Sequence, residues 1–435
     1  MSLETTFCGR KIRSPFGAAA LALSSPGAQN PKIYTDRILK FIEYGSGIAS
    51  TFIIREESIK DYPKHKEPTY IWGRINRPEH NYLIAQADAE QIQGRIEVGL
   101  ELTKILRERC PPDVLVQANV VVHTLEPKQW ADHCKAFEDA GADLIELDVS
   151  CGADKPGVEP DVPYSWMEGM PAQYISDRPL VLAEIIKAIT SVVKIPVGFK
   201  MSAETGWPRF LYIAKAAYEA GAKFVSCTNV HIGINGIDIY NRGKPDRDSA
   251  QLTKNQFGAL VGCSGYAGMK QVAGIKLFVP ELDLVGISGI RKPEDVVAYI
   301  MLGAQITEVC SGIMYYGGRF IKRVKYFLER FMKEQGYNSI DEMRGLALKE
   351  FELDSSKVDY GYGKKLAVTD EAKCTGCGFC VDSQCFASYL ENGIAKVNSD
   401  ECTGCGLCVW ICPEEARSLV MREKPRRVGI KALDA

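Results

Sequence analysis

The sequence predicts a parallel α/β fold, a (β/α)8 TIM barrel over most of the chain, followed by a small α+β domain rich in cysteine. From about residue 14 to 320, short β-branched runs alternate with helical stretches, which is typical of parallel strands joined by crossover helices. The 435 residues, 46% hydrophobic and 25% charged, suit one large and one small globular domain. We expect a barrel over 1–348, a linker over 349–366, the small domain over 367–420 and a basic tail over 421–435.

Eight runs are predicted as strands, which is the number that closes a (β/α)8 barrel. They are 16–21, 47–53, 114–122, 144–150, 195–200, 224–230, 284–289 and 306–312. A doubly wound open sheet is the alternative, but no GxGxxG follows the first strand, as a dinucleotide-binding sheet would require. The strand count therefore favours the barrel.

Helices are expected between these strands, for example over 129–142, 209–222 and 293–304. Each of the three ends in Gly-Ala just before the next strand, as a helix with a glycine cap should. A further helix, turn and helix are expected over 322–348. Three connections are too long for simple barrel loops: 55–112, 151–178 and 231–280. They could be peripheral decoration, but in a barrel such loops gather at the carboxyl ends of the strands, where active sites lie.

Eight cysteines form two tight runs near the end of the chain, Cys374-Cys377-Cys380-Cys385 and Cys402-Cys405-Cys408-Cys412. This spacing resembles that of two-cluster ferredoxins, in which the fourth cysteine of each run binds the other cluster. We therefore expect one [4Fe-4S] cluster on Cys374, Cys377, Cys380 and Cys412, and a second on Cys402, Cys405, Cys408 and Cys385. Paired CxxC motifs also bind structural zinc, but zinc has no use for a third cysteine at the same spacing.

The first cysteine run departs from the usual ferredoxin pattern. Four residues, not three, separate Cys380 from Cys385, and Phe386 stands where a proline often follows. The extra residue raises a question about the local turn, while the ligand set stays complete.

The charge balance and the cysteine usage exclude several classes of protein. A net charge of −2 gives no reason to expect nucleic acid or an anionic membrane as a partner. Nowhere do 18 apolar residues run together, and the N-terminal residues contain no apolar signal-peptide core. We therefore expect a cytoplasmic protein whose cysteines stay reduced.

An ordered set of motifs resembles the dihydropyrimidine dehydrogenase family, within the wider class of dihydroorotate dehydrogenase-like barrels. The motifs are SPFGAAALA (14–22), ELDVSCG (146–152), VKIPVGFKMS (193–202), GAKFVSCTNV (221–230), CSGYAG (263–268), GISGIRKPEDV (286–296) and VCSGI (309–313). Each motif alone is weak, but their order and the ferredoxin-like segment that follows them are specific. The resemblance implies an oxidoreductase acting on CH–CH groups.

The resemblance also implies an FMN at the barrel mouth, with two [4Fe-4S] clusters as its one-electron partners. The FMN phosphate would lie on the turns Ser288-Gly289-Ile290 and Cys310-Ser311-Gly312, after the seventh and eighth strands. The implied cofactor-binding residues are Ala19, Lys200, Asn229, Gly265, Gly289, Ser311 and Gly312. The alternative is that the glycines among them serve ordinary turns.

Two residues carry the implied catalysis. Lys200 ends an apolar strand, and the matching lysine of the family stabilises the anion of the reduced flavin. Cys151 matches the family's catalytic cysteine, whose thiol protonates one carbon of the double bond while flavin N5 delivers hydride to the other. The alternatives are a surface lysine and a buried apolar cysteine; the latter is the reading for Cys8, Cys110, Cys134 and Cys227.

The expected substrate residues are Asp148, Ser150, Asn229 and Val230, and two of them depart from the family. Asp148 stands where the family has asparagine, and Val230 where it has threonine. Because an ionised carboxylate only accepts hydrogen bonds, we expect a cyclic substrate other than plain uracil or thymine. The expected reaction is reduction, or the reverse oxidation, of a carbon–carbon bond next to a carbonyl group. Dihydropyrimidine dehydrogenase activity proper is the alternative.

Electrons are expected to come from outside the chain, because the sequence has no dinucleotide-binding fingerprint. The expected source is an NAD(P)H-dependent flavoprotein subunit or a ferredoxin that docks on 367–420, in a homo- or hetero-oligomer. A rival hypothesis is an electron-transfer subunit in which FMN acts only as a relay. A tRNA-modifying enzyme is a weaker alternative, since the chain is nearly neutral.

Overall fold

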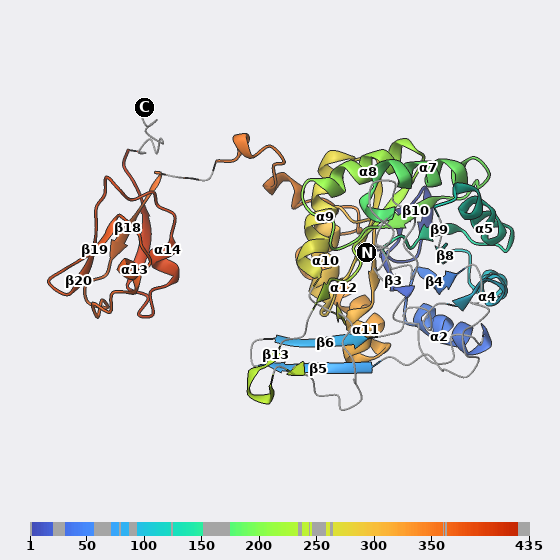
Figure 1. Cartoon of the computed structure of the whole chain (residues 1–435), viewed down its shortest axis with the longest axis horizontal. Coiled ribbons are helices and arrows are strands. Elements are labelled where there is room, and N and C mark those ends of the chain that lie inside the picture. Colours follow the sequence, from blue (N-terminus) through green and yellow to red (C-terminus); the bar gives the residue numbers. More distant parts are fainter. Residues whose placement is uncertain are drawn as a thin grey trace. The chain divides into compact units, whose positions relative to one another are not determined.

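The structure, a computed structural model, describes residues 2–20, 31–55, 71–77, 80–86, 94–122, 125–150, 175–233, 237–242, 244–245, 258–261, 264–359, 361 and 363–424. The chain divides into two compact units, Met1–Phe351 and Glu352–Ala435 (Figure 1). Each unit is described by itself. Among the described residues, no helix combines the length and the apolar character needed to span a bilayer.

The first unit is a closed barrel of eight parallel strands, which confirms the predicted fold. The strands are β3 (Phe16–Ala18), β4 (Ile48–Arg55), β8 (Leu115–Val121), β9 (Leu144–Leu147), β10 (Val197–Lys200), β11 (Phe224–Cys227), β16 (Asp283–Ile287) and β17 (Ile306–Val309). Each predicted strand run contains or overlaps one of these. The sheet closes because β3 pairs with β17 on one side and with β4 on the other. A two-residue strand, β7 (Gly94–Arg95), also pairs with the end of β4.

Helices surround the strands (Figure 1). They are α2 (Pro31–Glu43), α4 (Ile96–Arg109), α5 (Pro127–Asp139), α7 (Pro179–Thr190), α8 (Arg209–Glu219), α9 (Gly265–Phe278), α10 (Pro293–Met301), α11 (Ser311–Tyr316) and α12 (Arg319–Gln335). The predicted Gly-Ala ends follow α5, α8 and α10, where Gly141, Gly221 and Gly303 have φ of +97°, +109° and +101°. The N–H of the next alanine then bonds back five residues, as in Ala142 to the carbonyl of Phe137 at 3.1 Å.

An N-terminal hairpin closes one end of the barrel. Its strands are β1 (Thr5–Phe7) and β2 (Arg10–Ile12), and they place Phe7 and Ile12 in an apolar cluster with residues from the starts of the barrel strands. The ring of Phe7 meets that of Phe224 edge to face at 5.2 Å. Because this end is filled with apolar side chains, a ligand can reach the interior from the other end, where the strands finish.

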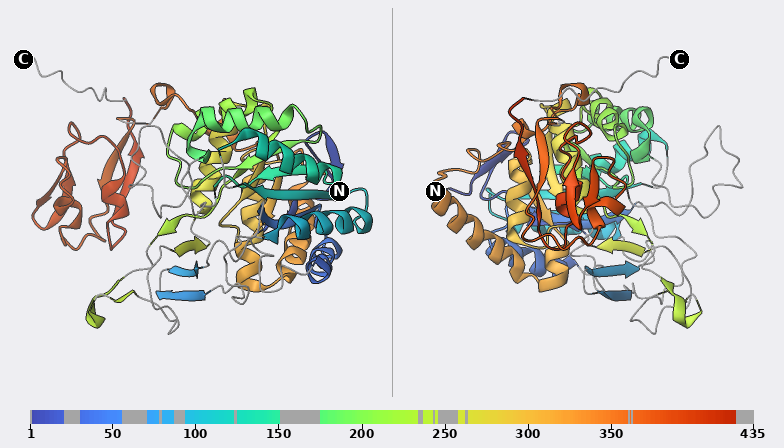
Figure 2. Two further views of the ribbon diagram at one scale, coloured as in Figure 1. Left: turned by 45° about the vertical axis from the view of Figure 1, so that its right-hand side comes forward. Right: turned by 90° about the vertical axis from the view of Figure 1, so that its left-hand side faces the viewer.

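Two of the three long connections fold together. They contribute β5 (Ile71–Arg77) and β6 (His80–Gln86) from one, and β12 (Ile232–Gly233) and β15 (Gly258–Val261) from the other. These strands form one antiparallel sheet in the order β12-β15-β6-β5 (Figure 2). A small ribbon of β13 (Ile237–Asp238) and β14 (Lys244–Pro245) belongs to the second connection. The connection over 151–178 lies largely outside the described residues.

The prediction of two helices over 322–348 is wrong for the second helix. Helix α12 ends before Gly336, whose φ is +78°, and turns follow instead of another long helix. The backbone N–H groups of Gly345 and Ala347 bond to carbonyls of Ile300 and Met301, both at 3.0 Å. The segment therefore bonds to the C-terminal end of α10, and its backbone donors are no longer free for a helix of their own.

The second unit contains two similar halves. Strand β18 (Lys365–Thr369) pairs with β21 (Arg417–Met421), and β19 (Ser388–Glu391) pairs with β20 (Ile394–Val397). Each cysteine run includes one short helix, α13 (Phe379–Asp382) or α14 (Leu407–Trp410). The core of this unit consists mainly of alanines and cysteines, so few large side chains hold it together. Such a small core is typical of domains that a metal group stabilises.

Candidate functional site

The barrel interior changes from apolar to polar toward the ends of the strands. Six buried polar side chains come from six different strands: Ser50, Gln117, Glu146, Lys200, Ser226 and Glu308. Polar groups in such a place need partners, because burial removes their hydration. The partners they find set the charge at the barrel mouth.

Lys200, the last residue of β10, is only 4% exposed. Its Nζ lies 3.9 Å from Oε1 of Glu146 and 3.8 Å from Oδ2 of Asp148. Its ammonium group is therefore buried between two carboxylates from the neighbouring strand and the residues that follow it. This burial contradicts the alternative of a surface lysine.

Glu308 lies deeper in the same group. Its Oε1 accepts hydrogen bonds from Nε2 of Gln117 at 2.8 Å and from the hydroxyl of Ser50 at 3.3 Å, while its buried Oε2 has no hydrogen-bond partner among the described residues. Burial, and then the charge of Glu146, raise the pKa of Glu308 to about 8. Burial also raises the pKa of Glu146, although its carboxylate accepts a hydrogen bond from Ser226. Glu308 therefore keeps its proton at neutral pH.

Three of the four expected substrate residues form one chain of hydrogen bonds beside Lys200. The hydroxyl of Ser150 donates to Oδ1 of Asp148 at 3.0 Å, and Nδ2 of Asn229 donates to Oγ of Ser150 at 3.0 Å. Oδ1 of Asn229 accepts the N–H of Val230 at 2.9 Å. The structure thus brings Asp148, Ser150 and Asn229 together with Lys200 at the carboxyl ends of β9, β10 and β11. Cys151, the expected catalytic cysteine, lies outside the described residues.

The turn after β16 has an unusual backbone. Ser288 and Gly289 have φ of +80° and +68°, and the buried hydroxyl of Ser288 has no hydrogen-bond partner among the described residues. A Cβ on Gly289 would lie 2.3 Å from the Cα of Gly265, so the two glycines must touch. The hydroxyl of Tyr299 lies 3.0–3.3 Å from the carbonyl oxygens of Ile287, Ser288 and Gly265. This tight turn, with an unused hydroxyl, fits a phosphate contact.

Three other expected cofactor residues, Ala19, Ser311 and Gly312, belong to or follow the neighbouring strands β3 and β17. Ala19 is buried, and its N–H donates to the carbonyl of Val309 at 3.1 Å. Ser311 begins α11 and is 2% exposed. Gly312 is required by packing, because a Cβ there would lie 2.3 Å from the ring of Phe320.

The sequence reasoning missed several residues of this region. Glu146 was missed, although it stands two residues before the expected Asp148, and this period of two could have indicated that both point to the same side. Glu308 and Tyr299 carry no comparable signal, since each stands alone in an apolar strand or helix.

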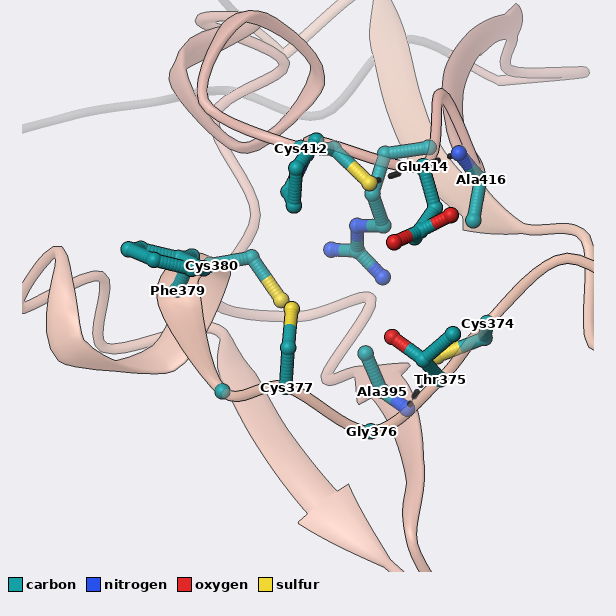
Figure 3. A pocket seen from close by; sticks show the side chains of 13 residues that line it. Cys374, Thr375, Gly376, Cys377, Phe379, Cys380, Ala395, Cys412, Glu414 and Ala416 are labelled. Atoms are coloured by element: carbon teal, nitrogen blue, oxygen red, sulfur yellow. Dashed lines mark hydrogen bonds between the residues drawn. The ribbon is translucent and has the colours of Figure 1, made fainter.

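In the second unit, the cysteines line two separate pockets. One is lined by Cys374, Cys377, Cys380 and Cys412, and the other by Cys385, Cys402, Cys405 and Cys408. Figure 3 shows the thiols of the first pocket on its wall. The two groups are those expected from the spacing, with the fourth cysteine of each run in the pocket of the other. In the described part of the chain, no three Cys, His, Asp or Glu side chains are arranged around a single metal ion.

The surroundings of the thiols fit an iron-sulfur cluster. The N–H of Ala395 donates to Sγ of Cys374 at 3.4 Å, and the N–H of Ala416 donates to Sγ of Cys412 at 3.3 Å (Figure 3). Such N–H···S bonds stabilise cluster thiolates and help to set their potential. Four thiols, two of them with amide donors beside them, form a donor set that suits a [4Fe-4S] cluster.

The longer spacing in the first run is taken up at Gln384. This residue has φ of +61°, and its N–H bonds to the carbonyl of Val381 at 3.1 Å. The extra residue forms a left-handed turn, and Cys385 still lines its pocket. Phe386, which follows, is 95% exposed.

The barrel with a buried lysine at its mouth, joined to a unit with two cysteine pockets, defines an oxidoreductase with an iron-sulfur domain. The chain belongs to the dihydroorotate dehydrogenase family, whose model matches residues 2–332. A 4Fe-4S binding domain matches residues 395–418. This family is flavin-dependent, and the chain is an oxidoreductase of the class that acts on CH–CH groups.

Several curated proteins are similar to the chain over most of its length. The NAD-dependent dihydropyrimidine dehydrogenase subunit PreA of Escherichia coli is 27% identical over 397 residues, 87% of this chain and 84% of that protein. The catalytic subunit of dihydroorotate dehydrogenase B (NAD(+)) from Thermoplasma volcanium is 30% identical over 348 residues, 80% of this chain and 99% of that protein. The chloroplastic dihydropyrimidine dehydrogenase (NADP(+)) of Arabidopsis thaliana is 23% identical over 403 residues, 89% of this chain and 88% of that protein.

Proposed function

We propose that the chain is the catalytic subunit of an FMN- and iron-sulfur-dependent enzyme. It reduces, or in reverse oxidises, a carbon–carbon bond next to a carbonyl group in a cyclic substrate. The observation that supports this most strongly is the group at the barrel mouth, where Lys200 is buried 3.8 Å from Asp148 and the hydrogen-bonded Ser150 and Asn229 lie beside it. These residues occupy the face on which barrel enzymes carry their catalytic groups.

FMN would be held by residues on both sides of this mouth. The turn at Ser288 and Gly289, with Gly265 against it, would receive the phosphate. Lys200 would stabilise negative charge on the reduced ring. Ala19, Ser311 and Gly312 are further candidate contacts. When bound, FMN supplies the hydride through N5 and exchanges single electrons with iron-sulfur clusters.

The chain's own residues would provide the proton and the orientation of the substrate. Cys151 would give the proton in reduction and take it in the reverse direction, since a thiol with a pKa of about 8.5 is mostly protonated at neutral pH. Asp148, Ser150, Asn229 and Val230 would line the substrate. Ser150 donates its hydroxyl proton to Asp148 and accepts a hydrogen bond from Asn229. In this arrangement the hydroxyl of Ser150 does not donate to the substrate.

The same hydrogen bonds favour a substrate other than plain uracil or thymine. An ionised Asp148 only accepts hydrogen bonds, whereas an asparagine there could also donate to a ring carbonyl. The substrate should therefore present a donor or a positive charge to this wall. The alternative is dihydropyrimidine dehydrogenase activity proper, which the 27% identity to the E. coli subunit keeps open.

Electrons would reach the flavin through two [4Fe-4S] clusters, on Cys374, Cys377, Cys380 and Cys412 and on Cys385, Cys402, Cys405 and Cys408. They would come from an NAD(P)H-dependent flavoprotein subunit or a ferredoxin. Two observations support a partner: the sequence has no GxGxxG fingerprint, and the E. coli relative is named as a subunit of an NAD-dependent enzyme.

The decisive experiment is Cys151→Ala in the holoenzyme. We expect FMN and iron content to stay unchanged while turnover of the substrate falls by at least a thousandfold, because the proton donor is lost. Cys110→Ala, in a buried cysteine near the closed end of the barrel, is the matched control and should keep its turnover. Unchanged turnover in Cys151→Ala would favour the relay hypothesis instead.

The substrate is tested with reduced holoenzyme, whose reoxidation is followed through the flavin absorbance. Uracil and thymine are compared with cyclic enones and with ring compounds that carry a basic nitrogen. We expect reoxidation by uracil to be much slower than by the best of these compounds. Fast reoxidation by uracil would contradict the non-pyrimidine part of the proposal.

A further inference from the structure

A buried arginine lines one of the two cysteine pockets. Arg417, the first residue of β21, is 3% exposed and lies on the wall of the pocket formed by Cys374, Cys377, Cys380 and Cys412. A full positive charge therefore lies next to four thiols that would be thiolates in the cluster-bound protein.

The hydrogen bonds of Arg417 go to two hydroxyl groups, and the exposed Glu414, which lines the same pocket, forms no ion pair with it. Nη1 donates to the hydroxyl of Thr369 at 2.5 Å and Nη2 to the hydroxyl of Ser388 at 3.2 Å. Nε is buried and has no hydrogen-bond partner, and no carboxylate within the described residues forms an ion pair with this side chain. Burial of a guanidinium without an ion-pair partner raises the free energy of the folded protein. A negatively charged group bound in this pocket would lower it.

The internal repeat of this unit shows which residue of the other half corresponds to Arg417. The N–H of Cys374 bonds to the carbonyl of Asp370, and the N–H of Cys402 bonds to that of Asn398, both at 3.1 Å. Gly376 and Gly404 occupy matching positions, with φ of +71° and +74°. The two halves therefore share this local hydrogen bonding and the spacing of their first three cysteines.

The repeat identifies Ser388 as the residue that corresponds to Arg417. The carbonyls of Ala416 and Ala387 accept from Asp370 and Asn398, both at 2.8 Å, so these two alanines are equivalent. The residue after Ala416 is Arg417, and the residue after Ala387 is Ser388. The repeat therefore places a cation in one half and a neutral hydroxyl in the other, and the two side chains touch.

The second pocket has no buried cation in its wall. The charged residue that lines it is the exposed Glu401. Arg422 lies in the same half, but it donates to the backbone carbonyls of Ser399, Cys402 and Lys365 and does not line the pocket. Because Arg422 is also partly exposed, water screens its charge more than that of Arg417.

We propose that Arg417 makes the two clusters unequal, so that the cluster of Cys374, Cys377, Cys380 and Cys412 has the higher reduction potential and receives an electron first. This inference rests on the proposed cluster ligands. Reduction of each cluster adds one electron from an external reductant and changes its core from the 2+ to the 1+ state, with no bond made or broken. A buried positive charge nearby favours the state with one more negative charge, and low local polarity strengthens the effect.

The test is a potentiometric titration with dithionite, followed by EPR, on the holoprotein and its variants. For Arg417→Gln we expect the equilibrium constant for one-electron reduction of the first cluster to fall at least tenfold, ~59 mV per factor of ten. Arg417→Lys keeps the charge and should change this constant by less than about threefold. The control Lys373→Gln removes an equal charge from the residue before Cys374, but this side chain is 59% exposed and the constant should stay the same.

The two clusters are told apart by Cys377→Ser and Cys405→Ser, each of which alters the signal of its own cluster. In the unmodified protein, the signal altered by Cys377→Ser must titrate at the higher potential. Equal potentials or the reverse order would overturn the inference, even if the Arg417 variants fail to fold. So would an unchanged constant in Arg417→Gln.

Iron analysis separates this inference from the proposed function. A protein with about eight iron atoms per chain but equal potentials would overturn the inference alone, because the ligand sets would stand. Fewer iron atoms would contradict the ligand sets and overturn both. The titration needs no organic substrate, so its result does not depend on the proposed reaction at the barrel mouth.

Discussion

Two buried cations, Lys200 and Arg417, lie where electrons are expected to reside, and their surroundings are opposite. Lys200 is buried between carboxylates, with Glu146 at 3.9 Å and Asp148 at 3.8 Å. Among the described residues, the side chain of Arg417 has the hydroxyls of Thr369 and Ser388 as its hydrogen-bond partners. The first charge is balanced by the chain itself, and the second is left for a cofactor to balance.

This difference predicts how each site responds to loss of its cation and to a change in pH. In the barrel, removal of the lysine leaves carboxylates without a counterion, and the protonation of Glu308 offers a second way to adjust the charge. In the small unit, the hydrogen-bond partners of Arg417 are hydroxyl groups and not carboxyl groups. The stability of the barrel site should therefore depend on pH through Glu308.

The largest expected effect is that of Lys200→Met. It leaves Glu146 and Asp148 buried without their cation, and breaking a buried ion pair costs about 3–5 kcal/mol. The free energy of unfolding of the barrel, measured by urea titration, should fall by this amount, and adding Glu146→Gln should recover part of it. Lys215→Met, in an exposed pair with Glu219, is the control and should change it by less than about 0.5 kcal/mol. An equal loss in both variants would mean that the burial of Lys200 has no special role.

The next effect concerns pH. The pKa of Glu308 is raised to about 8 in the folded protein from 4.5, so the stability it contributes is full below pH ~4.5 and is lost as the pH rises through about 8. In this range the free energy of unfolding should fall by at most about 1.4 kcal/mol per pH unit on account of this group. Glu308→Gln should remove this part of the slope, while Glu329→Gln, whose side chain is 45% exposed on α12, should keep it. An unchanged slope in Glu308→Gln would mean that another group causes the pH dependence of the free energy of unfolding.

The smallest expected effect is that of Thr369→Val in the small unit. Nη1 of Arg417 loses its acceptor, and a buried donor without a partner costs about 1–3 kcal/mol. The melting temperature of the cluster-loaded unit should fall accordingly. Ser388→Ala should lower it less, because the contact of Ser388 with Arg417 is longer, at 3.2 Å. The opposite order would show that Ser388 is the main anchor of Arg417.

The barrel could be predicted from sequence because its signals are local. Each strand is a short β-branched run, and the Gly-Ala pairs at 141, 221 and 303 end helices with a positive φ that glycine adopts easily. The segment after α12 was mispredicted because its partner, the end of α10, is distant in sequence. Long-range bonds from Gly345 and Ala347 decide its shape, and no local pattern shows them.

The candidate site was predictable in part for the same reason. The cysteine spacing indicated which thiols share a pocket, because cluster ligands follow a fixed pattern in the chain. Lys200, Asp148, Ser150 and Asn229 were expected near one another because parallel strands finish at one end of a barrel. The proton on Glu308 and the isolation of Arg417 could not be predicted, since both depend on what surrounds a side chain in space.

The hairpin of β1 and β2 has a kinetic consequence. Because Phe7 and Ile12 fill one end of the barrel, the described residues leave the opposite end as the route to the interior. Substrate and product must therefore pass through the same opening in turn, and each excludes the other while it is bound. The rate of turnover then depends on how soon the product departs as well as on how fast it forms.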